Sequence, residues 1–326
     1  MKIIEVVAHR NHIASVEEIS KKHGAVDQWY VSSPDNEERR VMRLLVDDSH
    51  RQAVMDALQN LLTLHEATRI VVLPVEATLP QIEIDEKEKA KTGGATREEL
   101  YYGVAKNAEL NSNFLLLVFL STIVAAIGLI ENNIAVVVGA MVIAPLLGPN
   151  IALALSAALG DTPLMWKSLK TNLIGLGLAL SLSLTIGLIL PIDLNSQELM
   201  SRTTVGIGSV VLALASGAAA VLSLTTGLSS VLVGVMVAVA LLPPTATVGL
   251  MLGSGQFELA LGAALLLAVN IVCVNLAAKI VFLVRGVKPR TWLEKRKAKQ
   301  SMVTYMTFWI LSLIILLAAI YLRRHF

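Results

Sequence analysis

The sequence predicts a polytopic α-helical membrane protein that carries a small α+β domain at its N-terminus. Hydrophobic residues make up 55% of the 326 residues and charged residues 16%, against roughly 45–50% and about 25% in soluble domains. The charges are also unevenly placed, because residues 203–257 contain no Asp, Glu, Lys or Arg and residues 113–159 contain only Glu131. Helices that are apolar on every face must be buried in a large core or in lipid.

Residues 1–80 are predicted to form a separate cytoplasmic domain. A hairpin turn at Pro34-Asp35-Asn36 joins its two middle strands. The order β-α-β-β-α-β is that of a ferredoxin-like fold, with both helices on one face of an antiparallel sheet. The strands are expected at 2–8, 26–33, 39–46 and 68–74, and the helices at 11–24 and from a capping box at 49–52 onward.

A ferredoxin-like fold hosts many functions, so it does not identify one. The single cysteine of the chain is Cys273, and a carrier of soft metals would need thiolates in this domain. We interpret the scattered histidines of the domain as surface residues and not as metal ligands. The exposed edges of the sheet favour a regulatory role or homo-oligomerisation.

Residues 81–112 connect this domain to the membrane. A charged linker over 81–94 is followed by a helix over about 96–109, which a second capping box opens at Thr96. Its apolar stripe consists of Leu100, Val104 and Ala108. The helix either lies on the membrane surface, with Tyr101 and Tyr102 at the headgroups, or packs on the protein itself.

About seven segments from residue 114 onward are long and apolar enough to cross about 30 Å of hydrocarbon. The first six form a membrane domain over about 113–285. A basic cytoplasmic loop and a final transmembrane helix occupy 286–326. The segments lie near 114–130, 134–159, 167–190, 204–226, 230–252, 259–284 and 303–322.

The membrane domain contains an internal repeat, whose copies cover about 113–190 and 203–285. A shift of 95 residues places VVVGAMV at 136–142 on VLVGVMV at 231–237, and Gly160 on Gly255. Because each copy contains three crossings, we expect the second copy to be inserted upside down. The predicted architecture is therefore a 3+3 inverted repeat plus one helix.

The basic residues predict that the N-terminus faces the cytoplasm and that the chain lies in the cell (inner or plasma) membrane. Short cytoplasmic loops are enriched in Lys and Arg, and the segments at 161–170 and 285–299 are basic and fall on that side. Arg323 and Arg324 disagree, because a seventh crossing would place them outside.

The second helix of each copy contains a break, and these breaks are the predicted substrate or ion site. Proline removes a donor and clashes with the preceding turn, and non-helical backbone within a membrane needs a cavity or covering protein. Paired broken helices in inverted repeats are where transporters bind solutes. The predicted site residues are Pro145, Gly148, Pro149, Asn150, Pro243, Pro244, Thr245 and Thr247. The alternative is a pair of kinks that only shape the bundle.

Other polar residues in the spans are Asn172, Asn270 and Asn275, which we interpret mainly as interhelical hydrogen-bonding groups. Lys279, near the cytoplasmic end of its helix, is expected to extend toward the interface. The absence of a deep carboxylate argues against a proton relay of the usual Asp or Glu kind, whereas sodium coordinated by carbonyls and hydroxyls stays an open alternative.

The segment VGAMVIAPLLGP at 138–149, preceded by TREEL at 96–100, resembles the bacterial and archaeal uncharacterised hydrophobic domain family, the domain of unknown function 389. The resemblance covers roughly 96–285. It implies a prokaryotic membrane protein of several helices, and it implies no activity and no functional residues.

We therefore expect a membrane transporter or channel for a small solute or ion, regulated or assembled by the N-terminal domain. The alternative is a membrane-anchored sensor or scaffold in which that domain binds a regulatory ligand or mediates oligomerisation. The spans offer no base beside their Ser, Thr and Asn residues, so we expect no enzyme, no catalytic residue, no metal and no cofactor. The expected partners are the lipid bilayer, the solute and further copies of the chain, without nucleic acid.

Overall fold

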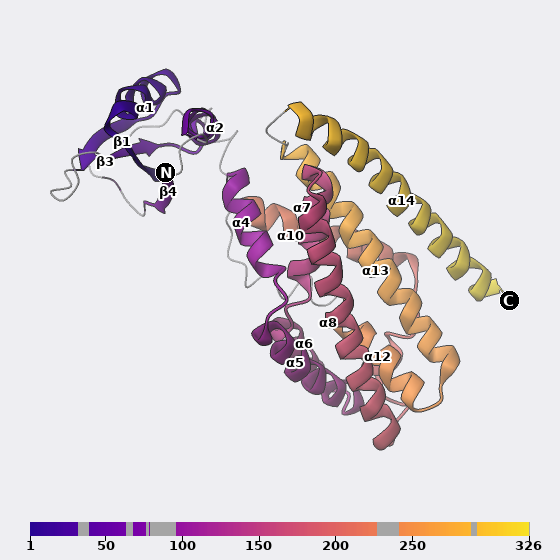
Figure 1. Cartoon of the computed structure of the whole chain (residues 1–326). Coiled ribbons are helices and arrows are strands. Elements are labelled where there is room, and N and C mark those ends of the chain that lie inside the picture. Colours follow the sequence, from indigo (N-terminus) through magenta and orange to yellow (C-terminus); the bar gives the residue numbers. More distant parts are fainter. Residues whose placement is uncertain are drawn as a thin grey trace. The chain divides into compact units, whose positions relative to one another are not determined.

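The computed structural model describes residues 1–31, 39–62, 68–75, 78, 96–226, 241–287 and 292–325. The chain separates into two compact units, Met1–Arg97 and Glu98–Phe326. Each unit has its own packing and is described by itself. Figure 1 shows the elements of both.

The N-terminal unit contains a four-stranded antiparallel sheet in the order β2-β3-β1-β4. β1 lies in the centre and pairs Ile4 with Leu44 of β3 and with Val72 of β4. The elements are β1 (Lys2–His9), α1 (Arg10–Lys22), β2 (Asp27–Val31), β3 (Arg39–Val46), α2 (Arg51–Leu62) and β4 (Arg69–Pro74). The predicted order of strands and helices and the small sheet are confirmed, whereas the predicted turn at 34–36 lies outside the described residues.

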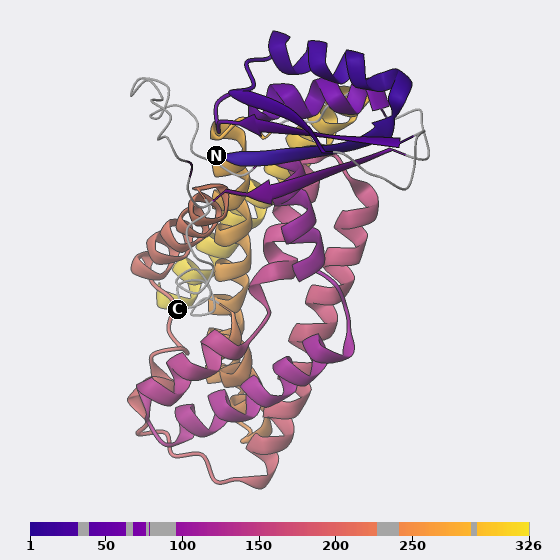
Figure 2. The same ribbon diagram turned by 90° about the vertical axis from the view of Figure 1, so that its left-hand side faces the viewer.

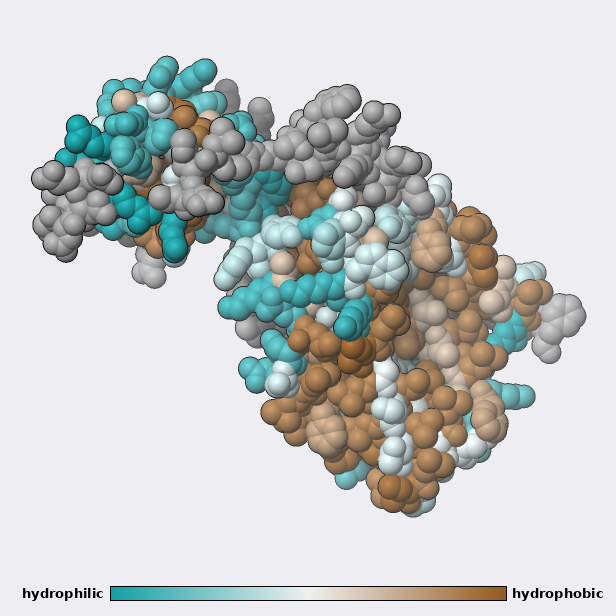
Figure 3. Space-filling view, in the orientation of Figure 1, coloured by the Kyte–Doolittle hydropathy of each residue, from teal (hydrophilic) through white to brown (hydrophobic). Residues whose placement is uncertain are grey.

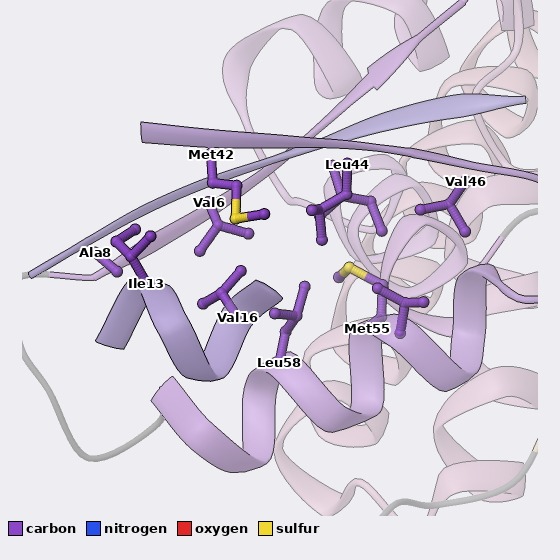
Figure 4. Packing of buried hydrophobic residues seen from close by; sticks show 11 residues of the cluster. Val6, Ala8, Ile13, Val16, Met42, Leu44, Val46, Met55 and Leu58 are labelled. Carbon is purple, nitrogen blue, oxygen red and sulfur yellow. The ribbon is translucent and has the colours of Figure 1, made fainter. Parts of the chain in front are cut away.

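The core of this unit lies between the sheet and its two helices (Figure 4). Alternate residues of a strand point to one face, so Ile4, Val6 and Ala8 of β1 are all buried. They pack with Val16 of α1 and Leu58 of α2. A hydrophobic face of each helix thus covers the same face of the sheet.

Asp47 closes the turn that precedes α2. Its Oδ1 accepts a hydrogen bond of 2.9 Å from the backbone N–H of His50. Ser49 Oγ donates to the other oxygen of the same carboxylate at 2.8 Å. The turn therefore closes around a carboxylate, a stronger acceptor than a hydroxyl.

The second unit is a bundle of apolar helices, and the chain is a membrane protein. Five of the described helices are long and apolar enough to cross a membrane, and a sixth span is formed if the bent pair α6 and α7 is counted as one. The helices are α4 (Arg97–Asn107), α5 (Ser112–Ile130), α6 (Ile134–Ile143), α7 (Leu147–Leu159), α8 (Thr162–Ile189), α9 (Gln197–Met200), α10 (Ile207–Thr226), α12 (Leu242–Gly253), α13 (Phe257–Val284) and α14 (Trp292–His325).

The outer surface of this unit is apolar, as a lipid-facing surface requires. Figure 3 shows a broad hydrophobic area over its helices, where residues such as Leu173, Leu188 and Ile189 are exposed. α5 and α6 pack side by side (Figures 1 and 2). The predicted span at 230–252 lies partly outside the described residues, and its described part is α12.

α4 packs on the protein, the second of its two predicted placements. Leu100, Val104 and Ala108 are all buried. Tyr101 Oη donates a hydrogen bond of 2.7 Å to Asp161 Oδ2, and this bond raises the pKa of Tyr101 to about 12. The apolar stripe of the helix is therefore covered by other parts of the protein.

The helix boundaries repeat with the shift of 95 residues found in the sequence. Shifted by 95, α8 (Thr162–Ile189) coincides with α13 (Phe257–Val284) at both ends. α7 begins at Leu147 and α12 at Leu242, and α5 begins at Ser112 and α10 at Ile207. The glycines that follow α7 and α12 both have positive φ angles, 72° at Gly160 and 77° at Gly255, a conformation in which a side chain would be strained.

α14 is longer than the predicted final span. The basic segment that was expected to be a loop is helical from Trp292 and continuous with the apolar part, Tyr305–Arg323. α14 packs against α13 and α7. Basic residues such as Lys and Arg are good helix formers, so a charged stretch before a span does not have to be a loop.

Candidate functional site

The first break separates α6 from α7, whose axes differ by 51°. Pro145 lies between them and cannot donate the hydrogen bond that would continue α6. In the first turn of α7, Gly148 lies so close to Asn107 that a Cβ would overlap the Asn107 carbonyl oxygen. The break is therefore tightly surrounded by protein on that side.

The second predicted break lies partly outside the described residues, and the described part is the start of α12 at Leu242. Pro243 and Pro244 occupy its first turn, a position where the missing N–H costs little. Thr245 Oγ1 donates a hydrogen bond of 2.7 Å to the carbonyl of Leu241. All five of these residues are buried.

α7 begins near the middle of α8. A Cβ placed on Gly175, which lies midway along α8, would be 3.0 Å from the Leu146 side chain. From there α7 runs toward the N-terminal end of α8, because only Gly160 and Asp161 separate the two helices. The two helices are therefore antiparallel.

α12 also runs alongside α8, but its direction along α8 is opposite to that of α7. Gly249 faces the backbone at Leu180 and Leu184, and one turn later Gly253 faces Gly187 and Leu188. The residue numbers of the contacting positions increase along both helices, so the two helices are parallel. Leu242 lies seven residues before Gly249, about 10 Å back along the axis, which places the start of α12 near the middle of α8 as well.

α7 and α12 thus both begin in the interior of the bundle and run toward opposite ends of α8 (Figure 1). A helix carries a partial positive charge at its N-terminus. Neither of these two N-termini is capped by a side chain, because the N-cap residues are Leu146 and Leu241. By contrast, Asn111, Asn133 and Asp161 cap α5, α6 and α8 with side-chain oxygens.

Two asparagines meet beside the start of α7. Asn275 Nδ2, from α13, donates hydrogen bonds to Asn150 Oδ1 and, at 3.0 Å, to the carbonyl of Ile271 on its own helix. Both asparagines have no exposed surface. This pair joins α7 to α13 and orients the Asn150 amide.

Several buried polar atoms near the breaks have no hydrogen-bond partner in the described part of the chain. They are Asn150 Nδ2, Asn172 Oδ1, Thr247 Oγ1 and Asn275 Oδ1. A buried polar atom without a partner costs about 1–3 kcal/mol, and native proteins leave few of them. Such atoms mark places where a bound molecule or water would be favourable.

The structure brings together some of the predicted site residues and not others. Asn150 and Asn275 are in direct contact, whereas Thr245 bonds its own helix carbonyl and Asn172 lies buried on α8. Asn270 is buried on α13, one or two turns before Asn275. The pairing of Asn150 with Asn275 could not be found from sequence spacing, because the residues lie on different helices in different copies of the repeat.

Lys279 does not extend to the interface as predicted. It is 2% exposed, and its ammonium lies over the rings of Tyr305 at 5.4 Å and Trp309 at 5.2 Å. The aromatic faces of α14 attract the cation. Among the described residues of this unit, Lys279 is the one charged side chain that is buried.

Comparison with known proteins places the chain in a family. The model of the family described as "Domain of unknown function (DUF389)" matches residues 141–276, which include both breaks and Asn275. The chain is 38% identical over 242 residues to "Uncharacterized protein MJ0678" of Methanocaldococcus jannaschii, an alignment that covers 74% of this chain and 75% of that protein. No solved structure matches. The chain therefore belongs to the DUF389 family of membrane proteins.

Proposed function

We propose that this protein is a transporter or channel for a small solute or ion, and that the solute passes the starts of α7 and α12. The observation that carries the proposal is the pair of uncapped helix N-termini inside the bundle, which run toward opposite ends of α8. Free backbone groups at such depth are tolerated where protein or a water-filled cavity satisfies them.

An inverted repeat underlies this arrangement in the proposal. α7 is antiparallel to α8 and α12 is parallel to it, so the equivalent half-helices of the two copies point in opposite directions. α12 leads into α13 through a short turn, so α13 runs antiparallel to α8. Two copies related in this way place their broken helices near the middle of the membrane, where transporters of this architecture bind their solutes.

The N-terminal unit has a supporting role in this proposal. Its sheet order and its two helices support a ferredoxin-like fold. The basic segments of the chain support a position of this unit on the cytoplasmic side of the plasma membrane. We assign to it the regulation or the homo-oligomeric assembly of the membrane unit.

A sensor or scaffold is the second candidate, because the N-terminal unit has a complete hydrophobic core of its own. In that case the helices would only anchor it. Solute flux through the full-length chain distinguishes the two, since a transporter shows flux of at least one solute and an anchored sensor shows none.

The test of transport uses purified protein in liposomes that are shrunk osmotically with one solute at a time. Vesicles swell again only if the solute enters. The panel contains small neutral solutes, potassium salts of several anions with valinomycin to carry potassium, and sodium and potassium salts of the lipid-permeant anion thiocyanate, because net entry of a salt requires both ions to cross. We expect wild-type vesicles to swell in at least one solute, and Asn150→Leu to slow that swelling about 10-fold or more, because a buried hydrogen-bonding group at the site is lost.

The matched control is Thr122→Val. Thr122 is buried on α5, and its hydroxyl donates to the carbonyl of Val118 at 2.6 Å, so this change removes a buried polar group that already has its partner within its own helix. It should leave the flux unchanged. Wild-type vesicles that behave like empty ones in every solute, or Asn150→Leu vesicles that swell at the wild-type rate, would contradict the proposal.

A further inference from the structure

We infer that the site at the starts of α7 and α12 selects a monovalent anion, or a solute with one anionic group. The inference rests on the proposed function and adds the charge of the solute to it. Four observations of this unit support it: the orientation of the two half-helices, the free donors of α7, the orphaned buried donors, and the sign of the buried charge.

The two helix N-termini supply about one positive charge together. α7 has 13 residues and α12 has 12, and each helix N-terminus acts as roughly half an elementary charge. Both begin near the middle of α8, so their positive ends lie at a similar depth in the bundle. One negative charge balances this pair, whereas a cation would be repelled by it.

The start of α7 also offers hydrogen-bond donors. The first N–H groups of a helix have no partner within the helix, and in α7 these include Leu147 and Gly148. α12 offers one fewer, because both Pro243 and Pro244 lack an N–H, whereas in the first turn of α7 only Pro149 does. The anion would therefore be hydrogen-bonded mainly by α7, and α12 would contribute chiefly its dipole.

Two unpartnered side-chain donors lie on the same helices. Asn150 Nδ2 in the first turns of α7 and Thr247 Oγ1 in the second turn of α12 are fully buried and have no partner within the described residues. Asn275 holds the Asn150 oxygen, which leaves the Asn150 nitrogen as the available group. The remaining unpartnered atom of the pair, Asn275 Oδ1, is an acceptor and takes no part in holding an anion.

The buried charge of the unit has the matching sign. Lys279 lies one turn beyond Asn275 on α13, and no described carboxylate forms an ion pair with it. None of the Asp and Glu side chains that the structure describes in this unit is buried. A site for a metal cation would need such carboxylates or a ring of oxygen ligands. The starts of α7 and α12 present donors and a positive field, whereas the unpartnered acceptors Asn172 Oδ1 and Asn275 Oδ1 lie on α8 and α13.

The test measures charge selectivity in proteoliposomes with a voltage-sensitive dye. A threefold gradient of a sodium salt is applied, with chloride, nitrate, formate, acetate or lactate as the monovalent anion and sulfate as the divalent control. We expect a membrane potential that follows the gradient of at least one monovalent anion, stays when potassium replaces sodium, and collapses with sulfate. Empty vesicles give the background.

Asn150→Asp separates an anion site from a cation site without a change of side-chain size. A carboxylate at the start of α7 should reduce the anion flux about 10-fold or more, while it would increase the flux through a cation site. Thr247→Val should reduce the anion flux as well, and Thr122→Val should not. Gel filtration of each variant checks that the protein remains folded.

The outcomes distinguish this inference from the proposed function. A potential that follows sodium or potassium, or swelling with neutral solutes only, would overturn the anion assignment and leave the transporter standing. No flux of any solute would overturn both. An Asn150→Asp variant with undiminished anion flux would show that the anion does not bind at the start of α7.

Discussion

Asn275 of α13 donates a hydrogen bond to Asn150 of α7 across 125 residues of sequence, and both side chains are fully buried. The bond links the half-helix of the first repeat copy to the long third helix of the second copy. It also fixes which atom of Asn150 remains free at the start of α7.

The asparagine pair should be energetically coupled. Removing either partner leaves the other buried without its hydrogen bond, at a cost of about 1–3 kcal/mol. Asn150→Leu and Asn275→Leu together should therefore cost less than the sum of the single changes, by about 0.5–2 kcal/mol. Reversible unfolding in mixed micelles with sodium dodecyl sulfate measures this cycle. Additive single effects would show that the two side chains do not interact.

Thr247→Val should leave stability unchanged or raise it by up to about 1 kcal/mol. The hydroxyl of Thr247 is buried without a partner in the described region, so its removal ends a desolvation cost. Thr122→Val, which removes a bonded hydroxyl, should lower stability by about 0.5–1.5 kcal/mol. Equal effects in the same unfolding assay would contradict the assignment of Thr247 as an unpaired donor.

Gly249→Ala should separate α12 from α8. A Cβ at Gly249 would overlap the Ser183 hydroxyl and the Leu180 carbonyl, and overpacking of this kind costs about 1–3 kcal/mol or more. Gly177→Ala on α8 is the control, because nothing lies within 4 Å of a Cβ there. It should be neutral or stabilising by up to about 1 kcal/mol. The reverse order of the two variants would mean that α12 packs elsewhere.

Tyr101 should lose its phenolic proton only at high pH. Its hydrogen bond to Asp161 raises the pKa of Tyr101 to about 12. A raised pKa of this acid means that the bond stabilises the folded state fully below pH 10, the ordinary tyrosine value, and that this contribution is lost as the pH rises through about 12. Ultraviolet titration of tyrosinate should show this late step in wild type and lose it in Tyr101→Phe. A titration that Tyr101→Phe leaves unchanged near pH 12 would place α4 away from Asp161.

The sequence predicted best the features that depend on residues close to one another along the chain. Strand alternation located the central strand β1, and proline located the starts of α7 and α12. The shift of 95 residues was visible in one motif, and the structure extends it to the ends of α8 and α13. These features depend on backbone constraints and hydrophobic periodicity, which neighbouring residues determine.

The remaining features depend on contacts between distant segments. The stripe of Leu100, Val104 and Ala108 fits a lipid surface and a protein surface equally well, so only the neighbours of α4 decide its placement. The environment of Lys279 is set by Tyr305 and Trp309 of α14, a helix outside the repeat. The partner of Asn150 likewise follows from the packing of α7 on α13.

Cysteine accessibility tests most directly whether a water-filled path reaches the starts of α7 and α12. Cys273, the single cysteine, is first replaced by alanine. Asn150→Cys and Thr247→Cys are then treated in proteoliposomes with a negatively charged, membrane-impermeant methanethiosulfonate. Thr122→Cys, which is also fully buried, is the control. We predict that the first two thiols react and are slowed by a permeant anion, while Thr122→Cys stays unlabelled. Thiols at 150 and 247 as unreactive as the one at 122 would show that the breaks only bend the helices.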